Sequence, residues 1–184
     1  MFTRKPVFVE PKAEPKPEPG LDLNSLGIID LDDLQADPLR NGLALWRLKK
    51  GERLFPSRED MSPRALGGLL RNVVLVKVLD EGHEFEIRIV GDVIASMQEI
   101  PIQGLRTREI DEILPGFGHA LRQIFVQISK NKTAMALRGK VLRNIGIAEI
   151  RREIVLLPLG ETDEAVDHIL ILMVYNPPEF STAA

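Results

Sequence analysis

Apolar residues recur at helical spacing in two stretches of the chain. The first stretch begins at Asp37-Pro38, where a capping residue precedes a Pro at the first helical position, and it ends near Gly51. The second stretch carries one apolar stripe over about four turns and stops near Lys130. The pattern therefore predicts two amphipathic helices. The apolar positions of the first are Leu39, Leu43, Leu45, Trp46 and Leu48, and those of the second are Phe117, Ala120, Leu121, Ile124, Phe125 and Ile128.

Strand patterns lie between and after these helices. Residues 73–78 are largely β-branched and apolar, residues 80–82 form a turn, and apolar and polar residues alternate over 84–89, which predicts an antiparallel hairpin. The region 91–114 shows only short helical pieces. Three further strand-like segments follow the second helix, at 133–142, 149–157 and 167–175. The order of helix, two strands, helical middle and three strands predicts an α+β domain, with a five-stranded antiparallel sheet and the helices on one face.

Composition divides the chain of 184 residues into four segments. Residues 1–20 are rich in Pro and in charges of both signs, which predicts a disordered tail. Residues 21–37 form an acidic apolar segment with five Asp and no Lys or Arg. Residues 38–176 make up the folded domain, and residues 177–184 a C-terminal tail. The acidic segment either packs on its own domain or docks on a partner, and the sequence leaves both readings open.

Charge and residue types argue against several classes of function. The chain has no Cys and only three scattered His, so we expect no metal site. Its formal net charge of -3 lacks the basic surplus of a nucleic-acid binder, and no apolar run approaches the roughly 20 residues of a membrane-spanning helix. Neither a nucleophile-elbow motif nor a phosphate-binding Gly-rich loop is present. We expect a cytoplasmic protein without enzymatic activity, nucleic-acid binding or membrane insertion.

Several local motifs have counterparts in a known family. Those before the hairpin are Leu45-Trp46, Phe55-Pro56-Ser57-Arg58 with Asp60 and Pro63, and Leu69-Leu70; those from the hairpin onward are Phe85-Glu86-Ile87-Arg88-Ile89-Val90-Gly91, Gln103-Gly104 and Leu157-Pro158-Leu159. Over roughly residues 38–176 the chain resembles the stand-alone PAS domain proteins of alphaproteobacteria, which are single-PAS regulators without an output domain. It departs from the family pattern at Asn144-Ile145-Gly146 and in the acidic segment.

The resemblance implies a PAS-like fold and a sensory or interaction role. In that fold the sheet and the middle helices enclose a face that can hold a small ligand, and the leading helix often mediates dimerisation. With no output domain expected, the signal would pass to another protein. We therefore expect a homodimer and a regulatory partner such as a signalling kinase, in regulation of the two-component or cell-cycle type. The alternative is a sensor that binds a small metabolite or haem, although no cofactor is required by the sequence.

Candidate residues follow from these two readings. The interaction or dimer helix presents Leu39, Leu43 and Trp46. The cavity candidates are inward apolar positions, which core packing explains equally well: Val76, Ile87, Ile89, Phe125, Leu137, Leu156, Leu170 and Leu172. Haem-binding PAS sensors ligate iron from a helix that precedes the last three strands, but His119 on that helix lies opposite the apolar stripe and should face water. The strand arginines Arg88, Arg138 and Arg151 either anchor a carboxylate or form salt bridges.

Overall fold

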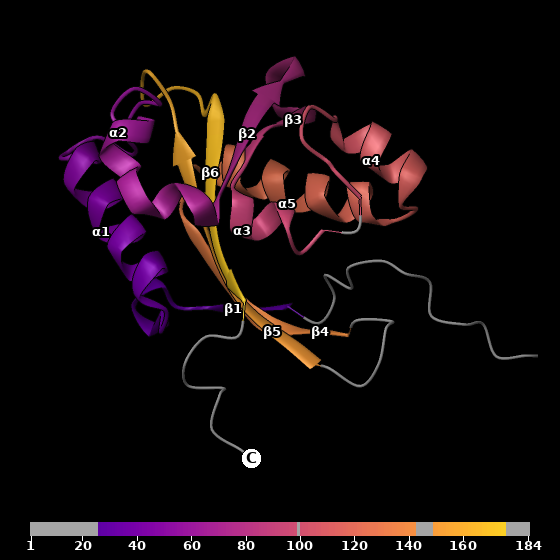
Figure 1. Cartoon of the computed structure of the whole chain (residues 1–184). Coiled ribbons are helices and arrows are strands. Elements are labelled where there is room, and N and C mark those ends of the chain that lie inside the picture. The colour runs from indigo at the N-terminus through magenta and orange to yellow at the C-terminus, as the bar shows by residue number, and fades with distance from the viewer. Residues whose placement is uncertain (1–25, 99, 143–148, 176–184) are drawn as a thin grey trace, which may run out of the picture.

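The sheet and its helices are described by a computed structural model over residues 26–98, 100–142 and 149–175. The predicted tails, residues 1–20 and 177–184, and the turn at 144–146 lie outside the described residues. Figure 1 shows one twisted sheet between a helix on one side and a pair of helices on the other. The described part of the chain thus has the mixed helix-and-strand fold that the sequence predicts.

Six antiparallel strands form the sheet, in the spatial order β1-β4-β5-β6-β2-β3. The strands are β1 (Leu26–Ile29), β2 (Val73–Leu79), β3 (Glu84–Val90), β4 (Met135–Leu142), β5 (Glu149–Leu159) and β6 (His168–Tyr175). The hairpin β2–β3 and the three strands after the long helix are those expected. The sheet has one strand more than the five predicted, and the addition comes from the acidic segment.

Strand β1 joins the acidic segment to the edge of the sheet. Its residues pair antiparallel with β4, from Leu26 opposite Gly139 to Ile29 opposite Ala136. The chain then passes through the short 3-10 helix η2 (Leu31–Asp33) and enters α1. Of the two readings left open for the acidic segment, the structure shows residues 26–29 paired with β4 in the domain's own sheet. Four residues that include a Gly carry too little alternation for the strand to be recognised from sequence.

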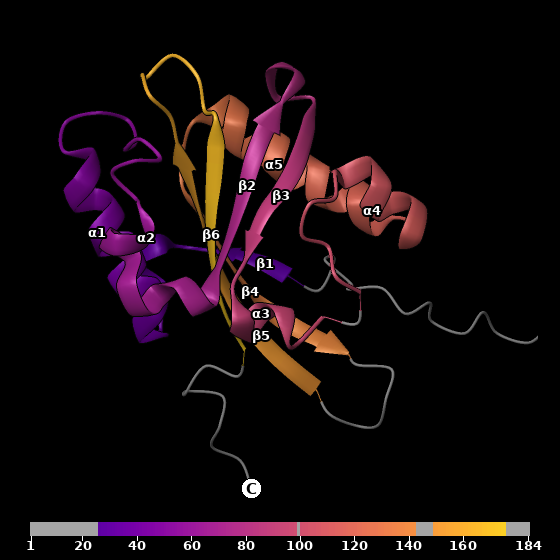
Figure 2. The same ribbon diagram turned by 45° about the horizontal axis from the view of Figure 1, so that its top comes forward.

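Helices cover both faces of the sheet. The longest are α1 (Asp37–Lys50) and α5 (Phe117–Asn131), and the shorter elements are α2 (Pro63–Leu66), η3 (Gly67–Asn72), η4 (Asp80–Gly82), α3 (Asp92–Ala95) and α4 (Thr107–Ile113). In Figures 1 and 2, α1 lies against one face of the sheet, and α4 and α5 lie on the other. The helices expected on one face are α4 and α5, and the N-terminal amphipathic helix, expected as a separate element, is α1 on the opposite face.

Alternation along the strands assigns the core residues to these two faces. Val73, Leu172 and Val155 are directly opposite one another on three neighbouring strands and point toward α1. The helix approaches closely there, because a Cβ added to Gly42 of α1 would lie 2.8 Å from the Leu172 side chain. The neighbouring row on the other face includes Val76 and packs toward α5. All of these side chains are buried, so the sheet is apolar on both sides.

Candidate functional site

The predicted cavity residues divide between the two faces of the sheet. Val76 pairs with Ile87, and both are at most 1% exposed. They lie on the face of α5, where the rings of Phe85 and Phe125 pack edge to face with centroids 5.4 Å apart. Register places two further candidates, Leu137 and Leu156, on this same face. These residues form a packed apolar layer, and a ligand among them stays a prediction.

Three of the cavity candidates lie elsewhere. Leu170 and Leu172 belong to the rows that face α1. A bulge between Leu75 and Val76 interrupts the β2–β3 register and brings Ile89 opposite Leu75, out of step with Ile87. Simple alternation across this bulge led to the wrong placement. The eight candidates therefore cannot line one common cavity.

The residues predicted for the interaction helix form the inner face of α1. Leu39, Leu43 and Trp46 are 0%, 4% and 6% exposed. Helix α1 packs on β5 and β6, so this stripe is buried against the chain's own sheet. Since the three side chains have little surface left for a second copy, they are placed here as core residues. A partner that leaves the fold intact must contact the outer face of α1 instead.

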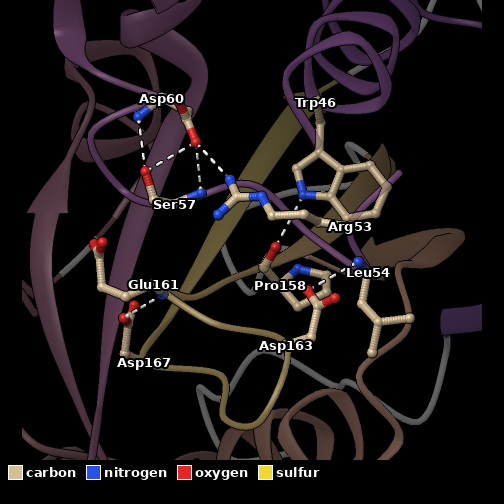
Figure 3. A network of polar contacts seen from close by, with 9 residues as sticks. All are labelled: Trp46, Arg53, Leu54, Ser57, Asp60, Pro158, Glu161, Asp163 and Asp167. Carbon is tan, nitrogen blue, oxygen red and sulfur yellow. Dashed lines mark hydrogen bonds and ion pairs between the residues drawn. The ribbon is translucent and has the colours of Figure 1, made fainter. Parts of the chain in front are cut away.

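Trp46 is held at a corner where two sequence motifs meet. Its indole Nε1 donates to the carbonyl oxygen of Pro158 at 2.9 Å, which ties the end of α1 to β5 (Figure 3). The Gly160 amide donates to the carbonyl oxygen of Pro56 at 3.0 Å, and a Cβ on Gly160 would meet the Phe55 ring at 2.5 Å. The segment beginning at Phe55 and the end of β5 are thus parts of one packed corner.

Asp60 organises the loop on the outer side of this corner. Its Oδ2 accepts hydrogen bonds from the Ser57 amide and hydroxyl, both at 2.9 Å, and from Arg53 at 2.7 Å (Figure 3). The hydrogen bonds from the Ser57 backbone and side chain, helped by the Arg53 charge, outweigh partial burial and hold the pKa of Asp60 below its ordinary value of 3.8. Every acceptor bond is local, so the arrangement fixes loop shape.

The β5–β6 loop is held by one internal hydrogen bond and by two contacts with neighbouring segments. Asp163 accepts a hydrogen bond from the Leu54 amide at 3.0 Å, and Asp167 accepts one from the Glu161 amide at 3.2 Å (Figure 3). From the end of α5, Lys132 donates to the carbonyl oxygen of Asp163 at 3.0 Å. The loop thereby connects α1 and α5, which cover opposite faces of the sheet.

A buried carboxylate on β5 fastens the entry to α1. Glu153 is 0% exposed and accepts hydrogen bonds from the Ala36 amide at 2.9 Å and the Gln35 amide at 3.1 Å. Arg138, opposite on β4, donates to the same carboxylate through Nε at 3.0 Å and also reaches the carbonyl oxygen of Asp33. We refer to Glu153 and Arg138 as the β4–β5 clamp. It holds the acidic segment and supplies an acceptor to the amides at the start of α1, where no local side chain forms a cap.

A second buried carboxylate connects β3 with α4. Glu84 is 6% exposed and accepts hydrogen bonds from the Thr107 hydroxyl and from the Phe85 amide, the latter at 2.9 Å. Burial alone would raise the pKa of Glu84, but the hydrogen bonds and the positive charges of Arg122 and Arg108 lower it below 4.5. The group is therefore ionised at neutral pH, and its hydrogen bond with Thr107 holds the start of α4.

The comparison with protein families adds to this geometry. The family model for the PAS domain matches residues 34–174. The chain belongs to the PAS domain family. No curated protein and no solved structure matches it in the corresponding searches. PAS domains are signalling or sensory modules, so the packed sheet and its two covered faces are those of such a module.

In this PAS domain the histidines do not form a binding centre. His119 is exposed, as its place opposite the apolar stripe predicted, and its ring contacts Gln123. His83 is exposed directly after η4, and His168 contacts Asp167 at 2.6 Å. Over the described ranges no group of three or more His, Asp or Glu side chains could hold a metal ion. Within the same ranges no helix combines the length and apolar character needed to cross a membrane.

Sequence reasoning missed the clamp and the exposed apolar positions of the PAS domain. Glu153 lies between Arg152 and the apolar residues 154–157 of β5, and a charge at an inward position was the available signal. Arg138 was expected to bind a carboxylate or form a salt bridge, and its partner is Glu153. Large apolar side chains on the surface have no comparable signature, since exposure depends on the tertiary fold. Among the described residues they are Ile28, Leu48, Leu54 and Ile113.

Proposed function

We propose that this PAS domain is a non-catalytic regulatory module that acts by binding another protein. Its place is in bacterial regulation of the two-component or cell-cycle type, within the cytoplasm, with a partner such as a signalling kinase. The chain's resemblance to single-PAS regulators of alphaproteobacteria supports this setting. Because such a module carries its message by contact, the proposal requires an outward surface that a partner can bury.

The observation that carries the proposal is an exposed apolar and basic surface at the end of α1. Leu48 is 75% exposed and Leu54 is 50% exposed. The last turn of α1, which carries Leu48, also carries Arg47, Lys49 and Lys50, and Leu54 follows shortly after it. We refer to these five residues as the α1 patch. Burying exposed apolar surface contributes about 25 cal/mol per Å², so Leu48 gains most from a partner.

The chemistry of the patch describes its partner. Three cations and two exposed leucines at and just after the end of α1 fit an acidic surface that offers an apolar side chain. The inner face of α1 is fixed in the core by Leu39, Leu43 and Trp46, so the patch is a rigid platform. A second copy of the chain, the expected homodimer, would also have to use this outer face.

The test compares two charge substitutions at exposed apolar positions. Leu48→Lys removes the centre of the patch, whereas Ile113→Lys changes a side chain that is 47% exposed on α4. Full-length protein is cross-linked in lysate to identify the partner. The Kd of each variant for the purified partner is then measured. We expect Leu48→Lys to raise Kd about tenfold or more and Ile113→Lys to leave it unchanged. Equal binding by both variants contradicts the proposal.

Truncation and native mass spectrometry complete the test. A shortened chain should begin at Leu26, because removal through Asp37 would delete β1 and the amides that Glu153 binds. Native mass spectrometry of gently purified protein reports oligomeric mass and any retained small molecule. A bare chain or dimer supports the interaction module, and an additional mass supports the metabolite or haem sensor instead.

A further inference from the structure

The two edges of the sheet differ in how they are covered. The outer side of β3 is closed by residues 103–106: the Ile87 amide donates to Leu105 at 2.9 Å, and the Gly104 amide donates to Ile87 at 2.7 Å. Gln103 accepts from the Val90 amide at 3.0 Å. The backbone of this edge is therefore already paired, and it offers no place for another strand.

The β1 edge lacks such protection among the described residues. β1 pairs with β4 on one side and ends the sheet on the other. Its four residues contain no charge and no Pro, which are the usual means of blocking an edge. Ile28 in the middle of the strand is 72% exposed. An uncharged edge with an exposed Ile is a template for pairing with an extended segment.

An open groove continues from this edge. It has a volume of about 530 Å³, and its lining combines Ile29 and Leu31 with residues 134–136 at the start of β4. The groove exists because β1 leaves β4 after Ile29 and turns into η2, so residues 134–135 extend beyond the last pair. It thus offers apolar surface beside free strand edge.

The rim of the groove carries negative charge. Asp30, Asp32 and Asp33 line it and are exposed. Asp32 forms an ion pair with Arg47 at 3.1 Å, and within the described part of the chain the carboxylates of Asp30 and Asp33 form no ion pair. Residues 21–37 contain no Lys or Arg, so a second copy paired through β1 would bring acidic segments together. Charge complementarity favours a basic occupant.

We propose that the β1 edge and its groove bind an extended basic segment of a partner protein. The segment adds a strand beside Leu26–Ile29, sets an apolar side chain against Ile28, and places Lys or Arg against Asp30 and Asp33. Backbone pairing gives affinity, and the acidic rim selects the sequence. This surface extends the proposed function, and its occupant has the opposite charge from the partner of the α1 patch.

The experiment uses full-length protein and synthetic peptides of alternating Val and Lys. We expect binding that weakens with added salt, together with slowed hydrogen exchange at the amides of residues 26–29. A peptide with N-methyl groups on alternate amides should lose binding, because it cannot pair with the edge. A peptide of alternating Val and Glu should also fail, because its charge matches that of the rim.

Matched variants separate this surface from others. Ile28→Lys should raise the peptide Kd about tenfold, and Asp30→Asn with Asp33→Asn should remove most of the salt dependence. Leu48→Lys, which tests the α1 patch, should leave peptide binding unchanged.

Four results would overturn the proposal: no protection of the β1 amides by peptide at low salt, equal binding of the N-methylated peptide, loss of binding in Leu48→Lys but not in Ile28→Lys, or a dimer that protects these amides without peptide. The last result would assign the edge to a second copy. All four results concern peptide binding or the β1 amides, and none depends on whether the α1 patch binds a partner. The two proposals can therefore be refuted independently.

Discussion

Glu153→Gln tests how much the β4–β5 clamp contributes to the fold. The substitution keeps the size of the side chain but removes a negative charge that is 0% exposed. Gln has one acceptor oxygen, so its NH2 group must face either the amides of Gln35 and Ala36 or the donors of Arg138. In both cases the Arg138 side chain, which is 19% exposed, loses its carboxylate partner. Breaking one side of a buried pair costs about 3–5 kcal/mol. That is a large share of the about 5–15 kcal/mol typical of a domain.

The loss should begin at the acidic segment. β1 is held by four ladder pairs with β4 and by the clamp, so weakening the clamp lets residues 26–36 open before the rest. Urea unfolding measures the global cost, and hydrogen exchange measures opening of the segment. Glu86→Gln is the matched control, since its partner Arg88 is 53% exposed and the pair is worth about 0–1 kcal/mol.

A double variant separates the two parts of the clamp. Glu153→Leu with Arg138→Met removes both charges, and apolar replacement of a whole buried pair is often close to neutral. The amides of Gln35 and Ala36 still lose their acceptor, at about 1–3 kcal/mol for a buried donor. We therefore expect the double variant to be less destabilised than Glu153→Gln, yet less stable than wild type. If Glu153→Gln stays within about 0.5 kcal/mol of wild type, with unchanged exchange over residues 26–36, the reasoning is refuted.

Three further predictions concern the core, a helix contact and acid stability. Trp46→Ala should lower the free energy of unfolding in urea by about 3–5 kcal/mol. Trp46→Phe should lower it less, because Phe keeps a buried aromatic ring and loses only the hydrogen bond to Pro158. If the variants change self-association in sedimentation but not stability, Trp46 is not a core residue. Gly118→Ala should cost about 1–3 kcal/mol or more, because its Cβ would lie 2.0 Å from a backbone oxygen, while Gly68→Ala, in open space, should not; equal melting temperatures would contradict this. Asp60 has a lowered pKa, so the stability that its carboxylate contributes is present at neutral pH and is lost as pH falls through its folded pKa, below 3.8. Asp60→Asn should therefore be less stable than wild type at neutral pH, and the difference in free energy of unfolding should shrink in acid. A difference that stays constant with pH would count against stabilisation by the ionised carboxylate.

Elements with a long, regular apolar pattern were predictable from the sequence. The first helix was expected from Asp37-Pro38 to near Gly51 and is α1, Asp37–Lys50; the second was expected to stop near Lys130 and is α5, Phe117–Asn131. Their periodicity persists over several turns, so single irregularities do not obscure it. The strands β2 to β6 were also predictable, because each has one or two faces that must be buried and so carries a regular apolar pattern.

Features that depend on contacts distant in sequence were not predictable. β1 is specified by β4, more than a hundred residues later in the chain, and its own four residues carry no clear period. The bulge at Leu75 and Val76 changed the face of Ile89, and strand order placed Leu170 and Leu172 under α1. Assigning a residue to one face of the sheet by alternation therefore requires the correct strand register, and that register is set by the tertiary fold.

The two proposed surfaces meet at one contact, and its strength limits how far they can influence one another. Arg47 belongs to the α1 patch and also lines the groove, where it pairs with Asp32 at 3.1 Å. Both side chains are at least half exposed, so the pair is worth about 0–1 kcal/mol. A partner on the patch that draws Arg47 away can change affinity at the groove by no more than that free energy, which is about fivefold. Larger coupling would require movement of the clamp, because Glu153 fixes the amides at the start of α1 while Arg138 holds the carbonyl of Asp33 beside the groove. The clamp is thus the element through which a strong signal between the two surfaces would have to pass.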